Sequence, residues 1–194
     1  MRSGPAVAPA GSSGSPEGRA WFWDLIEEAR RDTGSPADAV KTVSRATTLP
    51  AARNPQEIIA AQQILWDLMA ASCRAPLWAA AYLINGGCSD DGFDYFRGWL
   101  ITQGRTAFEQ VIADTDQLAG LRVVRQAVAD GRYLECEDTL GVARDAYRNA
   151  TGEELPDGTV TIRYPDLDPD WKFDFDDTSR IAPRLPRITA LCVN

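Results

Sequence analysis

The sequence predicts a mainly α-helical protein: a single helical domain of about six to eight helices, followed by an extended C-terminal arm and a short closing helix. Apolar residues recur at helical spacing from Trp21 to about residue 149, and capping signals divide this part into separate helices. Residues 159–164 alternate with a period of two, which indicates a short strand or an extended segment. We place the domain at residues 19–194, behind a disordered tail at 1–18 that is rich in glycine, serine and proline.

Short polar segments with helix-start signals separate the first three predicted helices. The first has an apolar stripe that begins at Trp21, and Gly34 ends it. Ser35 is the predicted N-cap of the second, with a proline and an aspartate in its first turn. Asn54 and Glu57 have the spacing of a capping box and predict a third helix. Because its apolar residues fall on two faces, we expect this third helix to be central.

Two further helices form the most apolar part of the sequence. Pro76 opens a helix that is apolar almost all round, so we expect it to be buried, and a glycine pair ends it. Ser89 caps the next helix, in which Phe93 and Phe96 face the core. After Gly104, weaker helices are expected around residues 108–112, 121–129 and 134–149, and a closing helix broken by two prolines is expected at 181–191.

The composition disfavours several classes of function. The chain has no histidine, which removes Ser-His-Asp and Cys-His catalysis and every zinc site that needs imidazole. Its cysteines form no Cys-x-x-Cys pair, and no stretch resembles a signal peptide or a membrane span. We therefore expect a cytoplasmic protein with reduced thiols and no membrane partner. A net charge of -8 without a basic stripe disfavours nucleic acid and suits a protein partner with a basic surface.

One cluster of candidate binding residues lies on the helix that Ser89 begins. Asp90, Asp94 and Arg97 fall at positions i, i+4 and i+7, so two carboxylates and a guanidinium share one face. Such carboxylates hold hard cations or serve in acid–base chemistry. The favoured interpretation is structural, because acids complement a helix N-terminus and Asp94 with Arg97 forms an ordinary i, i+3 pair. The candidate residues on this helix are Asp90, Asp91, Asp94, Tyr95, Arg97 and Trp99.

A second cluster lies in the aspartate-rich segment, residues 165–177. Five of its aspartates occupy positions 1, 3, 5, 9 and 12 of a twelve-residue window, as in an EF-hand calcium loop. Trp171 stands where that loop needs glycine and Asp177 where it needs glutamate, so we predict no cofactor, with Ca²⁺ or Mg²⁺ as the less favoured alternative. Trp171, Phe173 and Phe175 alternate with polar residues, which predicts an arm pinned across the helices or docked on a partner. The candidate residues here are Trp171, Asp174, Asp176 and Asp177.

Two blocks at the centre of the chain resemble a known family. Residues 78–87 (WAAAYLINGG) and 90–101 (DDGFDYFRGWLI) are similar to the core signature of a bacterial family of domains of unknown function. The opening helix with Phe22 and Trp23 and the closing residues 174–177 and 185–187 resemble the ends of that family. The resemblance implies a compact single domain, with some members associated with WGR-type modules. It implies no activity and no catalytic residue.

Two functional hypotheses follow from these residues. The first is a non-enzymatic protein-binding, regulatory or accessory module of a bacterial cytoplasmic system, based on the lack of nucleophile–base pairs and on the acidic charge. The alternative is a divalent-metal-dependent enzyme, in which the aspartates of residues 90–94 meet those of residues 174–177 around one ion. We favour the first hypothesis. The placement of the two aspartate clusters in the folded chain bears directly on the choice.

Overall fold

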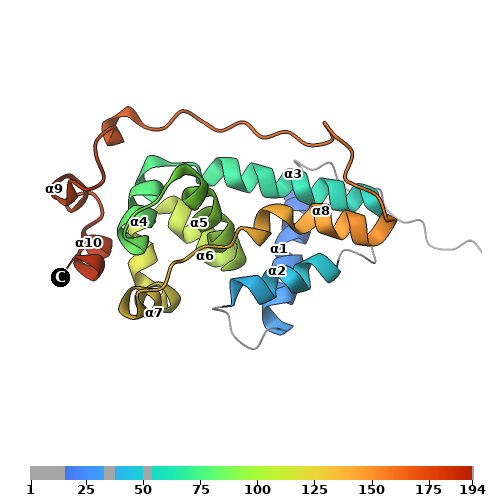
Figure 1. The fold of residues 1–194 in the computed structure, drawn as a ribbon, viewed down its shortest axis with the longest axis horizontal. Helices are drawn as coiled ribbons and strands as arrows, with labels where there is room; N and C mark the ends of the chain where they lie inside the picture. The colour runs from blue at the N-terminus through green and yellow to red at the C-terminus, as the bar shows by residue number, and fades with distance from the viewer. Residues whose placement is uncertain (1–15, 33–37, 50–53, 194) are drawn as a thin grey trace, which may run out of the picture.

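The computed structural model describes residues 16–32, 38–49 and 54–193 (Figure 1). Within these ranges the chain is mainly helical and has no strand, which confirms the predicted α-helical domain. None of the helices described there is long and apolar enough to span a bilayer. The helices are α1 (Pro16–Asp32), α2 (Ala39–Thr48), α3 (Pro55–Ser72), α4 (Ala75–Asn85), α5 (Asp90–Thr102), α6 (Arg105–Ala113), the 3₁₀ helix η2 (Thr115–Gly120), α7 (Arg122–Asp130), α8 (Asp138–Thr151), the 3₁₀ helix η3 (Pro169–Trp171), α9 (Thr178–Ile181) and α10 (Pro186–Cys192).

The central helices begin where the local capping signals stand. Before α3, the Asn54 carboxamide oxygen accepts the Glu57 backbone N–H at 2.9 Å, and the Glu57 carboxylate accepts the Asn54 N–H at 3.3 Å. This is the predicted capping box, and it satisfies two N–H groups that the helix leaves unpaired. Before α5, the Ser89 hydroxyl accepts the Gly92 N–H at 3.1 Å. Both predicted starts are therefore confirmed.

The first two helices differ in detail from the prediction. Helix α1 begins at Pro16, three residues before the predicted domain start, because proline suits the first turn of a helix. The rest of the predicted tail, residues 1–15, lies outside the described residues. The N-cap of α2 is Asp38, whose carboxylate accepts the Lys41 N–H at 3.0 Å. The predicted cap, Ser35, lies outside the described residues, as does Gly34.

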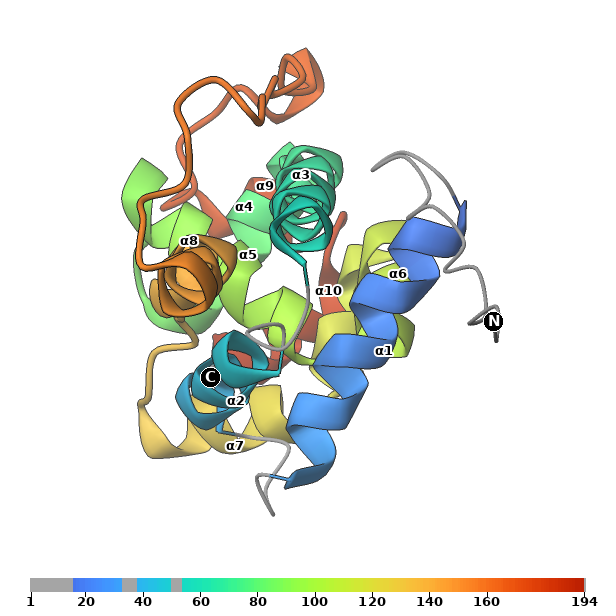
Figure 2. The ribbon, with the colours of Figure 1, turned by 90° about the vertical axis from the view of Figure 1, so that its right-hand side faces the viewer.

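Helix α5 lies at the centre of the helical body formed by α1 to α8 (Figure 2). It contacts α2, α3, α4, α6 and α8, and its residues Phe96 and Trp99 are buried. Gly98 allows the chain before α8 to approach closely, because a Cβ at this position would stand 2.6 Å from the Cys136 carbonyl oxygen. The Cys136 N–H in turn donates to the Tyr95 carbonyl at 2.9 Å. Helix α5 is thus enclosed from several sides, which restricts the positions of its side chains.

An extended arm, residues 153–177, leaves the end of α8 and runs along the long axis of the molecule to α9 (Figure 1). Residues 159–164, for which the sequence left a strand or an extended segment open, are extended and pair with no strand in the described part of the chain. Beyond the arm, the predicted broken closing helix is confirmed as α9 and α10. The arm therefore connects one end of the body to a pair of short helices at the other.

Helix α10 receives its N-terminal cap from a distant segment. It packs against α4, α7 and η2, and no side chain at Leu185 caps it. Instead the buried carboxylate of Asp116 in η2 accepts the Arg187 N–H at 3.0 Å and the Ile188 N–H at 2.9 Å. A carboxylate at this position satisfies two free N–H groups and complements the positive end of the helix.

We expect Asp116→Ala to lower the free energy of unfolding by about 1–3 kcal/mol, because it leaves the Arg187 and Ile188 N–H groups without an acceptor. Urea unfolding measures this loss, and faster tryptic cleavage after Arg184 reports release of α10. Asp130→Ala removes an exposed acid from α7 and should change stability by less than about 0.5 kcal/mol. Equal losses in the two variants would contradict the capping role.

Candidate functional site

Arg97 on α5 is a buried guanidinium, only 1% exposed, that joins three segments. Its Nε donates to the Phe93 carbonyl at 3.4 Å, its Nη1 donates to the Met69 carbonyl at the end of α3, and its Nη2 pairs with the Asp94 carboxylate. The guanidinium carbon lies 4.6 Å from the centroid of the Phe93 ring and 4.9 Å from that of the Tyr164 ring in the arm. Every one of these contacts favours the cation.

The partner of Arg97 on α3 explains why the charge is tolerated. Met69 belongs to the last turn of α3, where carbonyl groups lack helical N–H partners and carry the negative end of the helix dipole. The predicted ion pair of Asp94 with Arg97 is present. The sequence did not indicate its surroundings: α3 and the arm enclose the guanidinium, while the Asp94 side chain stays 34% exposed.

Two more anchors hold the arm against the body. Gln63 on α3 forms a matched pair of hydrogen bonds with the backbone of Thr161: its Nε2 donates to the carbonyl at 2.8 Å, and its Oε1 accepts the N–H at 2.9 Å. Tyr82 on α4 donates its hydroxyl to the Asp176 carboxylate at 2.6 Å, and its ring meets Phe175 edge to face. This hydrogen bond raises the pKa of the Tyr82 hydroxyl. The arm is therefore attached at its start, its middle and its end.

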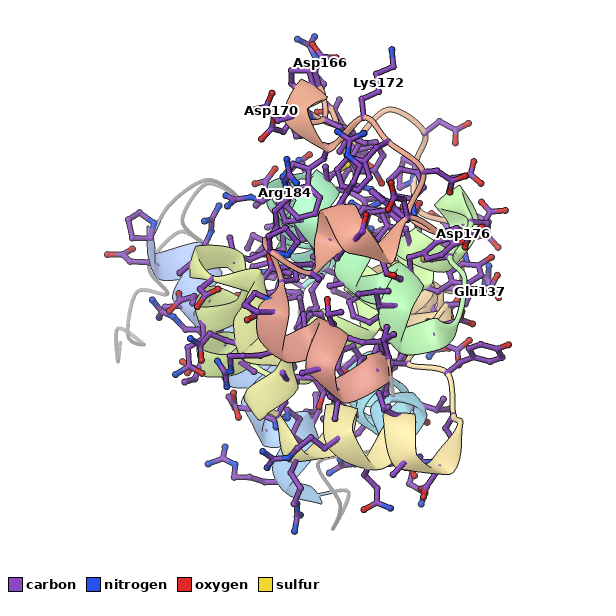
Figure 3. The ribbon with its side chains drawn as sticks, turned by 90° about the vertical axis from the view of Figure 1, so that its left-hand side faces the viewer. Glu137, Asp166, Asp170, Lys172, Asp176 and Arg184 are labelled. Carbon is purple, nitrogen blue, oxygen red and sulfur yellow. The ribbon has the colours of Figure 1, made fainter. Side chains whose placement is uncertain are left out.

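Aromatic side chains line the inner side of the arm near its end. Trp171 stacks on Phe173 with centroids 5.9 Å apart, and Phe173 meets Phe175 edge to face at 5.8 Å. Arg180 lies 4.2 Å from the Phe173 centroid, and Arg184 lies 5.5 Å from that of Trp171 (Figure 3). The three rings are half-buried against the core, and the residues between them are exposed. The predicted alternation is present, although the segment is no strand.

The aspartates of the two predicted clusters take part in separate local structures. Asp90 and Asp91 are exposed in the first turn of α5. In the arm, the Asp174 carboxylate accepts the Asp176 N–H at 3.0 Å, and Asp177 accepts a serine hydroxyl at 2.5 Å. Within the described residues, no three acidic or thiol side chains are grouped so that they could hold a metal ion. The two clusters therefore do not combine into one metal-binding group.

Two predicted site residues on α5 differ in accessibility. Trp99 is 2% exposed and packs its ring against Phe96 at 5.2 Å, so it belongs to the core. Tyr95 is half-buried, and burial together with the negative charge of Glu137 raises the pKa of its hydroxyl. Of these two, only Tyr95 is open to a partner.

Three residues that organise this region were not among the sequence-based candidates: Gln63, Tyr82 and Tyr164. Tyr164 was part of the alternating segment, and this was its only signal. Tyr82 lay in the family-like block, but nothing there indicated a partner 94 residues further on. Gln63 binds the backbone of Thr161. Every residue except proline has the same backbone groups, so no residue type in the sequence indicates such a contact.

All four cysteines are free thiols, and none is an activated nucleophile. Burial raises the pKa of Cys88 to about 12, with the charge of Glu135 adding to the effect and that of Arg97 opposing it. Burial also raises the pKa of Cys192 to about 11 and raises the pKa values of Cys73 and Cys136. A raised pKa lowers the thiolate fraction, which is the reactive form.

The fold and these contacts define an all-α domain whose chain continues into an acidic arm pinned along its side. The family model described as "Protein of unknown function (DUF4240)" matches residues 19–149, more than half of the chain. The chain therefore belongs to this family. The match ends within α8, so the closing residues 174–187 lie outside it. Searches of curated proteins and of solved structures gave no significant match.

We expect Asp94→Ala to lower the free energy of unfolding by about 3–5 kcal/mol, because it leaves the Arg97 cation buried without its carboxylate. Asp91→Ala is the matched control: it removes an exposed acid from the first turn of the same helix and should cost less than about 1 kcal/mol. Urea unfolding of both variants measures the difference. A loss for Asp94→Ala no larger than that for Asp91→Ala would mean that Arg97 does not depend on this pair.

We expect the folded chain to lose stability as pH rises from about 9 toward 12. Burial raises the pKa of Cys88 from its ordinary value of 9.0 to about 12, so the unfolded chain loses this proton at lower pH than the folded chain. Alkylation with iodoacetamide at pH 8.5 should be at least about tenfold slower at Cys88 and Cys192 than in the urea-unfolded chain. Mass spectrometry of the alkylated peptides measures both rates, and equal rates would contradict the burial effect.

Proposed function

We propose that this protein is a non-enzymatic binding or regulatory module of a bacterial cytoplasmic system, and that its arm docks on a protein with a basic surface. The charge distribution supports this proposal. Residues 153–177 contain nine acidic and two basic residues, a net of seven negative charges, and the net charge of the whole chain is -8. The family match ends at residue 149, so this charge is concentrated outside the part that matches the family.

The arm combines exposed acids with exposed apolar side chains. Asp166, Asp170 and Lys172 stand at the outer edge of the molecule, on the far side of the arm from the helices (Figure 3). Tyr164 is 44% exposed and Leu167 is 38% exposed. An extended segment with this pattern complements a groove that has an apolar floor and a basic rim. This combination on one extended segment is the observation that carries the proposal.

The metal-dependent alternative has less support. Its aspartates cap turns and helix ends, or accept a tyrosine hydroxyl, and in the described ranges they form no shared group of three. The thiols offer no other nucleophile at neutral pH, because burial raises their pKa values. A binding role needs neither a metal site nor a reactive thiol. It uses the acidic and apolar side chains that the arm exposes.

Replacement of three exposed arm acids tests the proposal: Asp166→Asn, Asp168→Asn and Asp170→Asn in one variant. Asparagine keeps an acceptor at residue 168, where the Asp168 carboxylate binds the Asp170 N–H at 2.9 Å, so the turn should persist. The immobilised full chain is incubated with lysate of its source organism at low and high salt. We expect the retained partner to bind about tenfold more weakly to the triple variant at low salt, and this difference to shrink at high salt.

The matched control replaces three exposed acids of the body, Glu17→Gln, Glu28→Gln and Glu135→Gln, and changes the net charge by the same amount. The chain has two lysines, Lys41 in α2 and Lys172 in the arm, so an amine-reactive cross-linker reports where the partner sits. We expect cross-links at Lys172. Cross-links confined to Lys41, or equal losses in the two triple variants, would contradict docking on the arm.

A further inference from the structure

A cavity of about 420 Å³ opens between α1, α3 and α6, and no residue of the arm lines it. In Figure 2, α1 and α6 both lie below α3. The volume falls within the range of small-molecule sites in proteins. None of the residues that contact Arg97 or anchor the arm lines this cavity, so it is a separate feature of the fold.

The floor of the cavity is aromatic and apolar. Trp23 on α1 and Phe108 on α6 are mostly buried, so only the edges of their rings line the cavity, and their ring centroids lie 5.4 Å apart. Leu68 and Ile112 extend this apolar surface. Among the described residues, no acceptor binds the indole N–H of Trp23. The floor therefore offers ring edges for an apolar group.

The rim of the cavity has an excess of positive charge. Arg19 has no acidic partner within the described ranges, and Arg74 donates only to backbone carbonyls, those of Ala71 and Ile112, each at 3.0 Å. Glu109 is the one acid on the rim, and Arg105 pairs with it at 2.8 Å. The charge of Glu109 is thus offset from outside the cavity, while two guanidinium groups are left without a carboxylate.

We propose that this cavity binds a small amphipathic carboxylate, an acid with one aryl group. The apolar group packs against Trp23 and Phe108, and the carboxylate is bound by the guanidinium groups of Arg19 and Arg74. Guanidinium groups recognise carboxylates through charge-assisted hydrogen bonds, and an aromatic floor supplies the contact area. A cation is repelled by the same rim, and a small acid without an aryl group gains little from the floor.

Titration of the full chain with four related probes tests this site: 3-phenylpropionate, 3-phenylpropylamine, 3-phenylpropanol and propionate. We expect saturable binding of 3-phenylpropionate with Kd of roughly 1 mM or tighter, by calorimetry. The alcohol and propionate should bind at least about tenfold more weakly, and the amine should not saturate. The six tryptophans give separate indole N–H signals in ¹⁵N spectra, and the Trp23 signal, assigned with Trp23→Phe, should shift on binding.

Two variants and a matched control locate the binding. Arg19→Gln should raise the Kd of 3-phenylpropionate about tenfold, whereas Arg125→Gln, the same change at an exposed position on α7, should leave it within about twofold. Ala71→Trp places a large side chain at the exposed edge of the cavity and should abolish binding without lowering the thermal midpoint of unfolding.

Three outcomes overturn the proposal. The first is no saturable binding of 3-phenylpropionate. The second is equal affinity for the amine, which would mean that the rim charge plays no part. The third is equal weakening by Arg19→Gln and Arg125→Gln, or binding that survives Ala71→Trp, since either result places the ligand elsewhere. The arm variants of the preceding section leave this cavity unchanged, so failure of one proposal does not decide the other.

Discussion

A guanidinium can be buried only where acceptors meet its N–H groups, and the acceptors of Arg97 come together only in the assembled fold. Its own helix supplies the Phe93 carbonyl and the Asp94 carboxylate, and α3 supplies the Met69 carbonyl. Tyr164 of the arm then covers the cation. Because the Arg97 guanidinium contacts α3, α5 and the arm, movement of any of these segments exposes the cation to solvent or removes one of its partners. The positions of these three segments are therefore coupled.

The arm has little regular hydrogen bonding of its own, and it depends on side chains of the body for its course. Gln63 and Tyr82 bind it near its start and its end, and its aromatic residues pack inward. Most of its acids are exposed to solvent, although Asp176 accepts the Tyr82 hydroxyl. One segment thus attaches to the body through its rings and presents negative charge to solvent. The proposed docking on a basic partner relies on this division of faces.

Helix α3 takes part in both proposed binding regions. Gln63 holds the arm, and Leu68 lines the cavity beside α1 and α6. The arm is acidic and extended, whereas the cavity is aromatic at its floor and cationic at its rim, so the two regions favour ligands of opposite charge. The sequence indicated the first region through the spacing of its aspartates and aromatics. It did not indicate the second, because Arg19 and Arg74 are 55 positions apart and meet only when α1 packs on α3.

What the sequence by itself determined is local: helical periodicity, the capping box at Asn54, the cap at Ser89 and the broken closing helix. These signals act within a few residues, so they can be recognised before the fold is known. The tertiary structure decided the rest. It buried Arg97, whose pairing with Asp94 was predicted but whose enclosure was not, and it brought Asp116 to cap α10 from 71 residues away. Such contacts depend on packing between distant segments, and no local pattern records them.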